Sequence, residues 1–219
     1  MDINVYINDL IKILKARFQN KLLYVGLQGS YFRGDASENS DIDIMVIFDK
    51  LEIASLDMYR DCLLKAGYYE KSCGFICGRD ELRNWNQFEI CHLLHSTQDY
   101  YGKLSDFLPE YSVFDVKNFV KLSANNLYHQ LCHGYIHSGK RQNSLDLPAV
   151  YKNAFFILQN VCYLKCGRFF QMKRDMLNFV DGSDKIILEN LLAISENGEH
   201  DFEKMFSDIF LWCKDLILK

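Results

Sequence analysis

The sequence predicts two regions of different class: an α+β (α/β) domain with a mixed sheet over residues 1–108, then an all-helical bundle domain over residues 109–219. In the first hundred residues, apolar side chains alternate between helical spacing and short continuous runs. From about residue 113 they recur at helical steps alone. We expect the boundary at Leu108-Pro109-Glu110, where the two patterns meet.

Helices and strands are expected to alternate in the first region. Apolar positions at helical spacing predict helices over residues 3–18 and 52–66. Short apolar runs predict strands that are buried in a sheet. These strands are expected over residues 22–27, 42–47, 70–78 and 87–95.

Only helices are expected in the second region, which fits a bundle of four or five of them. Glycines at the ends of the periodic stretches are typical of helix termini. The first of these helices is expected to start near residue 113, and the others to cover residues 147–166, 183–195 and 201–218.

The composition is that of an ordinary globular protein, with 49% hydrophobic and 25% charged residues. No apolar run approaches the roughly 20 residues that span a bilayer, and the amphipathic start does not resemble a signal peptide. A chain of 219 residues does not need disulfides, so we expect its 8 cysteines to be reduced and the protein to be cytoplasmic. The net charge of −4 argues against broad binding to nucleic acid.

One segment of the first region combines a glycine–serine turn with two neighbouring acids. Gly29-Ser30 ends the first expected strand, and Asp41-Ile42-Asp43 opens the second. Alternate residues of a strand point to one face, so Asp41 and Asp43 are expected side by side. Two adjacent carboxylates are unfavourable without a cation, and Mg²⁺ with phosphate oxygens suits such a pair. The segment therefore predicts metal-assisted transfer of a nucleotidyl group.

The complete pattern is more specific than either of its parts. Between the turn and the acids stand Arg33-Gly34, Ala36 and Ser40. This stretch resembles the signature of the DNA polymerase β-type nucleotidyltransferase superfamily. The order of the two regions extends the resemblance over most of the chain. It is similar to small bacterial nucleotidyltransferases with a helical C-terminal domain, which include the aminoglycoside and lincosamide nucleotidyltransferases.

The resemblance implies roles for the residues of this signature. Gly29-Ser30 would contact the β- and γ-phosphates of a nucleoside triphosphate, for which ATP is favoured by family habit. Asp41 and Asp43 would be catalytic and would bind one or two Mg²⁺ ions. Arg33 would either cover the phosphates or cap the loop, and Ser40 would position Asp41.

The family also has a third carboxylate, on a later strand next to the Asp-x-Asp strand, which helps to hold metal or acts as general base. Glu89 matches best, because it is the acid inside the apolar pattern of residues 87–95, which we expect to be a strand. Asp99 is the next candidate. Asp80 and Glu81 would require a different assignment of the strand.

The second region carries an unusually polar helix. His129, His133 and His137 recur at four-residue steps, which would allow a zinc site or simple hydrogen bonding between helices. In similar enzymes the helical domain contributes to the acceptor pocket. We therefore expect Tyr128 or His129 to line an acceptor cleft.

The leading functional hypothesis is a Mg²⁺-dependent nucleotidyltransferase that moves AMP from ATP to a hydroxyl of a small molecule and releases pyrophosphate. An aminoglycoside-like antibiotic is the first choice of acceptor, and a homodimer is compatible with the resemblance. A protein AMP-transferase of toxin–antitoxin type is a second hypothesis, although the helical region lacks a clear Arg-x4-6-His motif. An inactive nucleotide-binding or interaction module is a third, and the intact signature argues against it.

Overall fold

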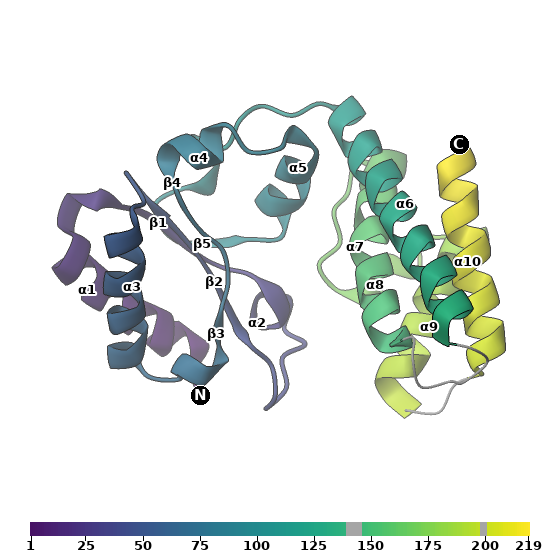
Figure 1. The fold of residues 1–219 in the computed structure, drawn as a ribbon, viewed down its shortest axis with the longest axis horizontal. Helices are drawn as coiled ribbons and strands as arrows, with labels where there is room; N and C mark the ends of the chain where they lie inside the picture. Colours follow the sequence, from purple (N-terminus) through teal and green to yellow (C-terminus); the bar gives the residue numbers. More distant parts are fainter. Residues whose placement is uncertain (139–145, 198–200) are drawn as a thin grey trace. The chain divides into compact units, whose positions relative to one another are not determined.

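The structure, a computed structural model, describes residues 1–138, 146–197 and 201–219. The chain divides into two compact units, Met1–Glu110 and Tyr111–Lys219 (Figure 1).

The first unit is built on a mixed sheet of five strands with the order β3-β2-β1-β5, in which β4 also pairs with β2. β1 is antiparallel to β2 and to β5, whereas β3 and β4 run parallel to β2. The prediction of an α+β domain with a mixed sheet is therefore confirmed. The strands are β1 (Leu22–Leu27), β2 (Ile42–Phe48), β3 (Ser72–Cys73), β4 (Ile76–Gly78) and β5 (Gln98–Tyr101).

The two faces of this sheet have different neighbours. Helices α1 (Ile3–Phe18) and α3 (Ile53–Ala66) pack on one face, against the side chains of β1 and β2 that point toward them. A smaller core lies on the other face, where Tyr24 and Met45 meet the short helix α4 (Arg79–Arg83) through Leu82. The second face is therefore only partly covered, which leaves room for a site.

The segment over residues 87–95 is a helix, α5 (Gln87–His95), so the prediction of a strand there was wrong. Asn86 caps this helix, since its side-chain oxygen accepts a hydrogen bond from the backbone N–H of Phe88 at 3.0 Å. A short apolar run does not distinguish a buried strand from a buried helix. The last strand of the sheet, β5, follows this helix instead.

The second unit is helical over its described residues, as the sequence predicted, and its core is made by the apolar faces of these helices. Buried polar side chains also join the helices. Asp184, 5% exposed, accepts hydrogen bonds from Trp212 Nε1 at 2.6 Å and from Lys165 Nζ at 2.7 Å. The helices are α6 (Val113–Ser138), α7 (Leu147–Cys166), α8 (Lys173–Met176), α9 (Gly182–Asn197) and α10 (Phe202–Leu218).

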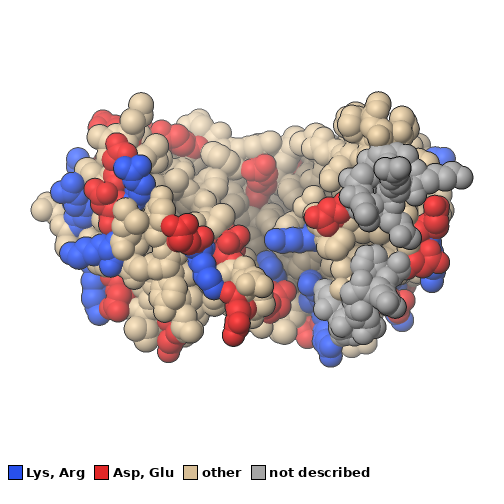
Figure 2. Space-filling view, turned by 60° about the horizontal axis from the view of Figure 1, so that its bottom comes forward, with Lys and Arg blue, Asp and Glu red and all other residues tan. Residues whose placement is uncertain are grey.

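The surface of the first unit carries charges of both signs (Figure 2). On the face of the first unit that Figure 2 draws, basic and acidic side chains are interspersed and form no large patch of one sign. None of the helices in the described part of the chain combines the length and apolarity needed to cross a membrane. All eight cysteines lie in the described ranges and are free thiols.

Candidate active site

Asp41 and Asp43 lie at the start of β2, on the less covered face of the sheet. Ile42 and Ile44, which alternate with them, are buried against α1 and α3. Because the strand alternates, both carboxylates point to the opposite face, in the row that continues with Met45. Asp41 is exposed and Asp43 is partly exposed. The two acids thus lie two residues apart where the strand begins, Asp41 directly before it and Asp43 within it.

The glycine–serine turn lies directly against Asp43. Helix α2 (Gly29–Arg33) starts at the end of β1, where the Gln28 backbone N–H donates to the Asp43 carbonyl at 2.8 Å. Gly29 has φ +65°, and a Cβ built on it would overlap the Asp43 carboxylate. Only glycine fits this position without displacing the acid. The turn and the carboxylate pair therefore form one structure.

Ser40 and Arg33 hold the loop that joins α2 to β2. Ser40 Oγ accepts a hydrogen bond from the Ser37 backbone N–H at 2.8 Å, which closes a turn just before Asp41. Arg33 is 15% exposed in its side chain, and its Nε lies 3.3 Å from Asp35 Oδ1. These contacts are those expected of residues that shape the loop.

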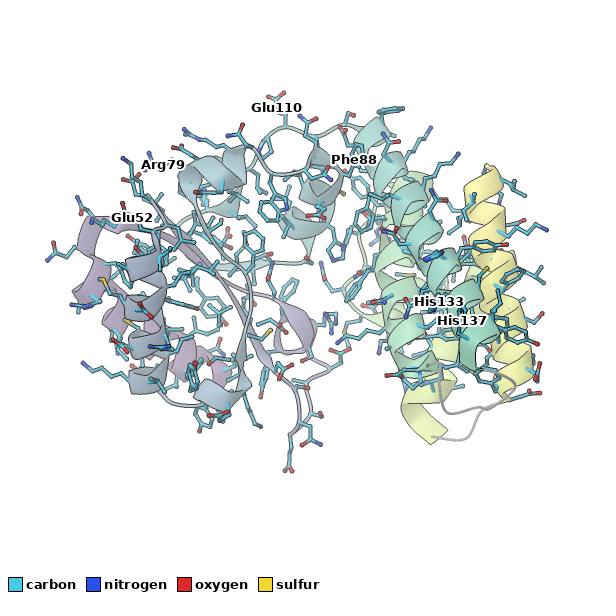
Figure 3. The ribbon with its side chains drawn as sticks, viewed as in Figure 1. Glu52, Arg79, Phe88, Glu110, His133 and His137 are labelled. Carbon is cyan, nitrogen blue, oxygen red and sulfur yellow. The ribbon has the colours of Figure 1, made fainter. Side chains whose placement is uncertain are left out.

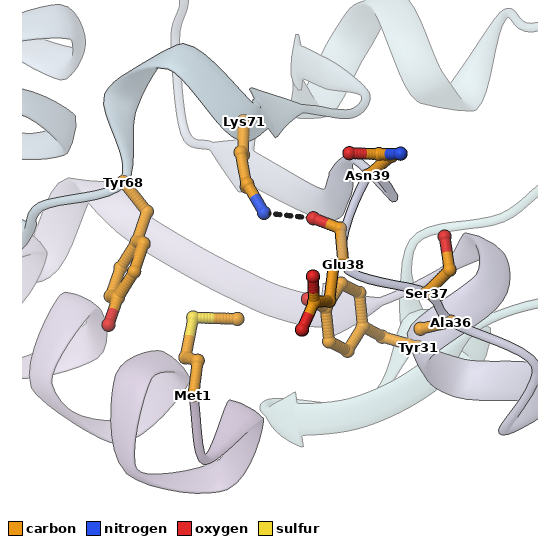
Figure 4. A pocket seen from close by; sticks show the side chains of 8 residues that line it. All are labelled: Met1, Tyr31, Ala36, Ser37, Glu38, Asn39, Tyr68 and Lys71. Carbon is orange, nitrogen blue, oxygen red and sulfur yellow. Dashed lines mark hydrogen bonds between the residues drawn. The ribbon is translucent and has the colours of Figure 1, made fainter.

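A hollow of about 710 Å³ lies beside this loop (Figure 4). Lys71 Nζ donates to the backbone carbonyl of Glu38 across it, as the dashed line in Figure 4 shows. The loop before Asp41 is thereby tied to the segment that leads into β3. The hollow is lined by Met1, Tyr31, Ala36, Ser37, Glu38, Asn39, Tyr68 and Lys71.

Glu89, the acid expected on a strand, lies in the first turn of helix α5 instead. Its Oε2 accepts a hydrogen bond from Trp85 Nε1 at 2.6 Å. Within the described ranges, no group of three or more His, Cys, Asp or Glu side chains is placed to hold a metal ion. Glu89 therefore does not form a three-ligand cluster with Asp41 and Asp43.

The other candidate acids also lie away from the strands beside β2. Asp80 and Glu81 are on helix α4. Asp99 is on β5, opposite Gly26 of β1, so β1 separates it from β2. Its Oδ1 accepts hydrogen bonds from the Tyr24 hydroxyl at 2.7 Å and from the Leu104 backbone N–H at 3.2 Å. Asp99 thus has a structural role in closing the sheet.

Helix α5 also carries His92 and His95, and His92 is close enough to Arg33 to feel its charge. Burial, the Arg33 guanidinium and His95 lower the pKa of His92 to about 4. Burial also lowers the pKa of His95. His92 is therefore a neutral imidazole at physiological pH.

The acceptor candidates of the second unit lie on different sides of α6. Tyr128 is half-buried and packs on Phe210 of α10, with ring centroids 5.0 Å apart. His129 is exposed, and its ring centroid lies 6.2 Å from that of His133. The His133 and His137 rings, labelled in Figure 3, follow at 4.4 Å. Tyr128 therefore packs between two helices, whereas His129 faces solvent, so the two side chains do not line one surface.

The two carboxylates fit a hard divalent cation. Mg²⁺ is usually bound by one or two protein carboxylates, and phosphate and water oxygens complete its octahedron. Asp41 and Asp43 provide two such groups on one face. The glycine beside them leaves space for a phosphate rather than a side chain.

Comparisons with known proteins agree with this chemistry. Residues 7–108 match the sequence model of the family described as "Nucleotidyltransferase domain". Two proteins of Methanocaldococcus jannaschii, each named "Putative protein adenylyltransferase", are 36% identical over 61 residues and 43% identical over 63 residues. These alignments cover 28% and 29% of this chain. The chain spans about three fifths of the length of these relatives, 61% and 58%.

A solved structure of similar fold covers almost the whole chain. It is spectinomycin adenyltransferase AAD(9) from Enterococcus faecialis, solved with ATP and spectinomycin. The match has a TM-score of 0.60 and 16% identity, and covers 98% of this chain and 99% of that one. At this identity the likeness establishes the fold, an α+β domain followed by a helical one.

Proposed function

Because residues 7–108 match the model of a nucleotidyltransferase domain, we propose that this chain is a Mg²⁺-dependent enzyme that moves AMP from ATP to the hydroxyl of a small molecule. One observation carries the proposal: Gly29 lies so close to the Asp43 carboxylate that no side chain fits between them. A phosphate beside Gly29 would lie next to Asp43. Phosphate binding and metal binding would then occur in one place.

Each residue of the turn has a defined task in this proposal. Asp41 and Asp43 hold Mg²⁺ together with phosphate oxygens, and Gly29-Ser30 receives the β- and γ-phosphates through its backbone N–H groups and the serine hydroxyl. Bound Mg²⁺ supplies positive charge that neutralises the phosphates. Ser40 fixes the loop ahead of Asp41, and Arg33 adds positive charge at the end of α2.

The reaction is a displacement at the α-phosphorus. The acceptor oxygen forms a bond to this phosphorus, the bond to the bridging oxygen breaks, and pyrophosphate leaves with the electron pair. The hydroxyl proton of the acceptor passes to solvent water. We assign Glu89 no role in this step, because it lies on α5 and accepts a hydrogen bond from Trp85.

The second unit, Tyr111–Lys219, is the proposed acceptor-binding domain. The fold shared with a spectinomycin adenyltransferase supports a small, hydroxyl-rich acceptor such as an aminoglycoside-like antibiotic. His129 is the better placed of the two acceptor candidates, because it is exposed whereas Tyr128 packs on Phe210. The names of the M. jannaschii relatives support a second candidate function, transfer of AMP to a protein.

Binding of nucleotide is tested first. The melting temperature of the protein is measured with ATP, GTP, CTP or UTP, each with and without Mg²⁺. We expect ATP with Mg²⁺ to raise it most, because a ligand that binds only the folded state stabilises that state by mass action. The proposal fails if no nucleotide raises the melting temperature in the presence of the metal.

The metal pair is tested with two Asp→Asn variants that remove the same charge. Asp43→Asn should lower pyrophosphate release about 100-fold or more, a typical loss when a group that stabilises transition-state charge is removed. Asp57→Asn, on the exposed side of α3 and 67% exposed, is the matched control and should keep full activity. Equal rates for the two variants would contradict the role of Asp43.

The acceptor is tested by mass spectrometry. Purified protein is incubated with ATP and Mg²⁺ and either a panel of aminoglycosides and related antibiotics or a lysate of small proteins. A gain of one AMP on a small molecule supports the first function, and a gain on a protein supports the second.

A further inference from the structure

The strand beside β2 places a cysteine next to Asp43. β3 runs parallel to β2 on the side away from β1, in a register that pairs Cys73 with Asp43. Paired residues of neighbouring strands, about 4.8 Å apart, point to the same face of a sheet. Cys73 is exposed. Cys73 therefore lies next to Asp43 in the sheet and on the same face of it.

The contacts of the neighbouring residues confirm this orientation. Ser72 pairs with Ile42, and its Oγ lies 3.5 Å from the Tyr6 hydroxyl of α1, so Ser72 faces the covered side. Cys73 follows Ser72 and must face the other side. Cys77 follows four residues after Cys73, so it faces the same side of the sheet, where it is buried in the core with Met45.

No acid occurs on this edge of the sheet. Residues 72–78, which form β3, β4 and their connection, read Ser-Cys-Gly-Phe-Ile-Cys-Gly. The resemblance implied a third carboxylate on a strand next to the Asp-x-Asp strand, and Cys73 is the residue that faces Asp43 from there. A thiol thus occupies the position where a carboxylate was expected.

We propose that Cys73, at the position where the third carboxylate was expected, forms one wall of the metal–nucleotide site. This inference rests on the proposed function. An alkyl group attached to Cys73 would fill the space beside Asp43 and exclude the nucleotide.

The position of Cys73 is tested by alkylation with iodoacetamide, with the modified peptides quantified by mass spectrometry. Cys166 of the second unit is also exposed and serves as the internal control. At ten times the dissociation constant of ATP, with Mg²⁺, the alkylation of Cys73 should slow about tenfold, since only the unbound fraction reacts. The alkylation rate of Cys166 should not change.

The outcomes separate this inference from the proposed function. If ATP with Mg²⁺ raises the melting temperature but leaves the alkylation rate of Cys73 unchanged, the proposed function stands and the inference on Cys73 is wrong. If ATP does not bind at all, both fail together.

Discussion

The two units use aspartate in opposite ways. In the second unit, Asp184 is buried and its two oxygens join Trp212 of α10 and Lys165 of α7 to α9. In the first unit, Asp41 and Asp43 lie at the open end of a strand, beside a glycine that leaves space for a ligand. The same side chain thus stabilises helix packing in one unit and, in the proposed function, binds a ligand in the other. Location in the fold, not residue type, distinguishes structural acids from functional ones.

The largest effect on stability is expected from Asp184→Asn. An amide has one acceptor oxygen, whereas the carboxylate uses two. The amide NH₂ group would therefore face either the Lys165 ammonium or the Trp212 N–H, and both of these are donors. Loss of a hydrogen-bonded charge that is this deeply buried should cost about 2–4 kcal/mol in the free energy of unfolding. Urea unfolding followed by circular dichroism measures it.

A matched control exists in the same ion cluster. Asp181 lies 3.5 Å from the same Lys165 Nζ, but its side chain is 94% exposed, so Asp181→Asn should change stability by less than about 0.5 kcal/mol. Asp43→Asn should likewise leave the fold intact. If Asp181→Asn destabilised as much as Asp184→Asn, the contrast between buried and exposed acids would be lost.

Gly29→Ala should have the next largest effect, in the first unit. Its positive φ costs about 1–2 kcal/mol for a residue with a Cβ, and that Cβ would also displace the Asp43 carboxylate. Gly34→Ala shares the strain, with φ +78°, but a Cβ there meets nothing within 4 Å. Both variants should lose stability in urea, whereas Gly29→Ala alone should lose the thermal shift produced by ATP and Mg²⁺.

A smaller effect is expected at the sheet edge. Tyr24→Phe removes the hydroxyl that donates to Asp99 and should cost about 1 kcal/mol. Asp99→Asn should cost a similar amount and leave the rate of pyrophosphate release within about twofold, because Asp99 is bonded inside the sheet. A large loss of rate in a stable Asp99→Asn protein would instead make Asp99 part of the reaction.

The smallest effect at neutral pH concerns His92. Its pKa is lowered from 6.5 to about 4 in the folded protein, so between these values the unfolded chain binds more protons. The contribution of neutral His92 to the free energy of unfolding is therefore complete above pH 6.5 and declines as the pH falls toward 4. His92→Gln, measured by urea unfolding over this range, should show a shallower decline. An unchanged slope would show that His92 titrates normally.

The sequence predicted those parts of the fold that depend on local pattern. The strand–turn–acid signature around Asp41 and the four long helices of the second unit follow from spacing alone, and the structure contains them. Helix α5 was missed because a nine-residue apolar run is ambiguous, and Glu89 was misplaced with it. Cys73 could not be found from sequence, since its position beside Asp43 depends on register between strands 30 residues apart.

The pairing of β1 with β5 has a consequence for the order of folding. The sheet is complete only when residues 98–101 pair with residues 22–27. The buried Tyr24 hydroxyl then gains its acceptor, Asp99. Contacts so far apart in the chain form slowly, because a long loop must close first. During synthesis, the first unit therefore remains incomplete until Tyr101 has left the ribosome. A ribosome stalled before residue 98 should hold a nascent chain that is still sensitive to protease.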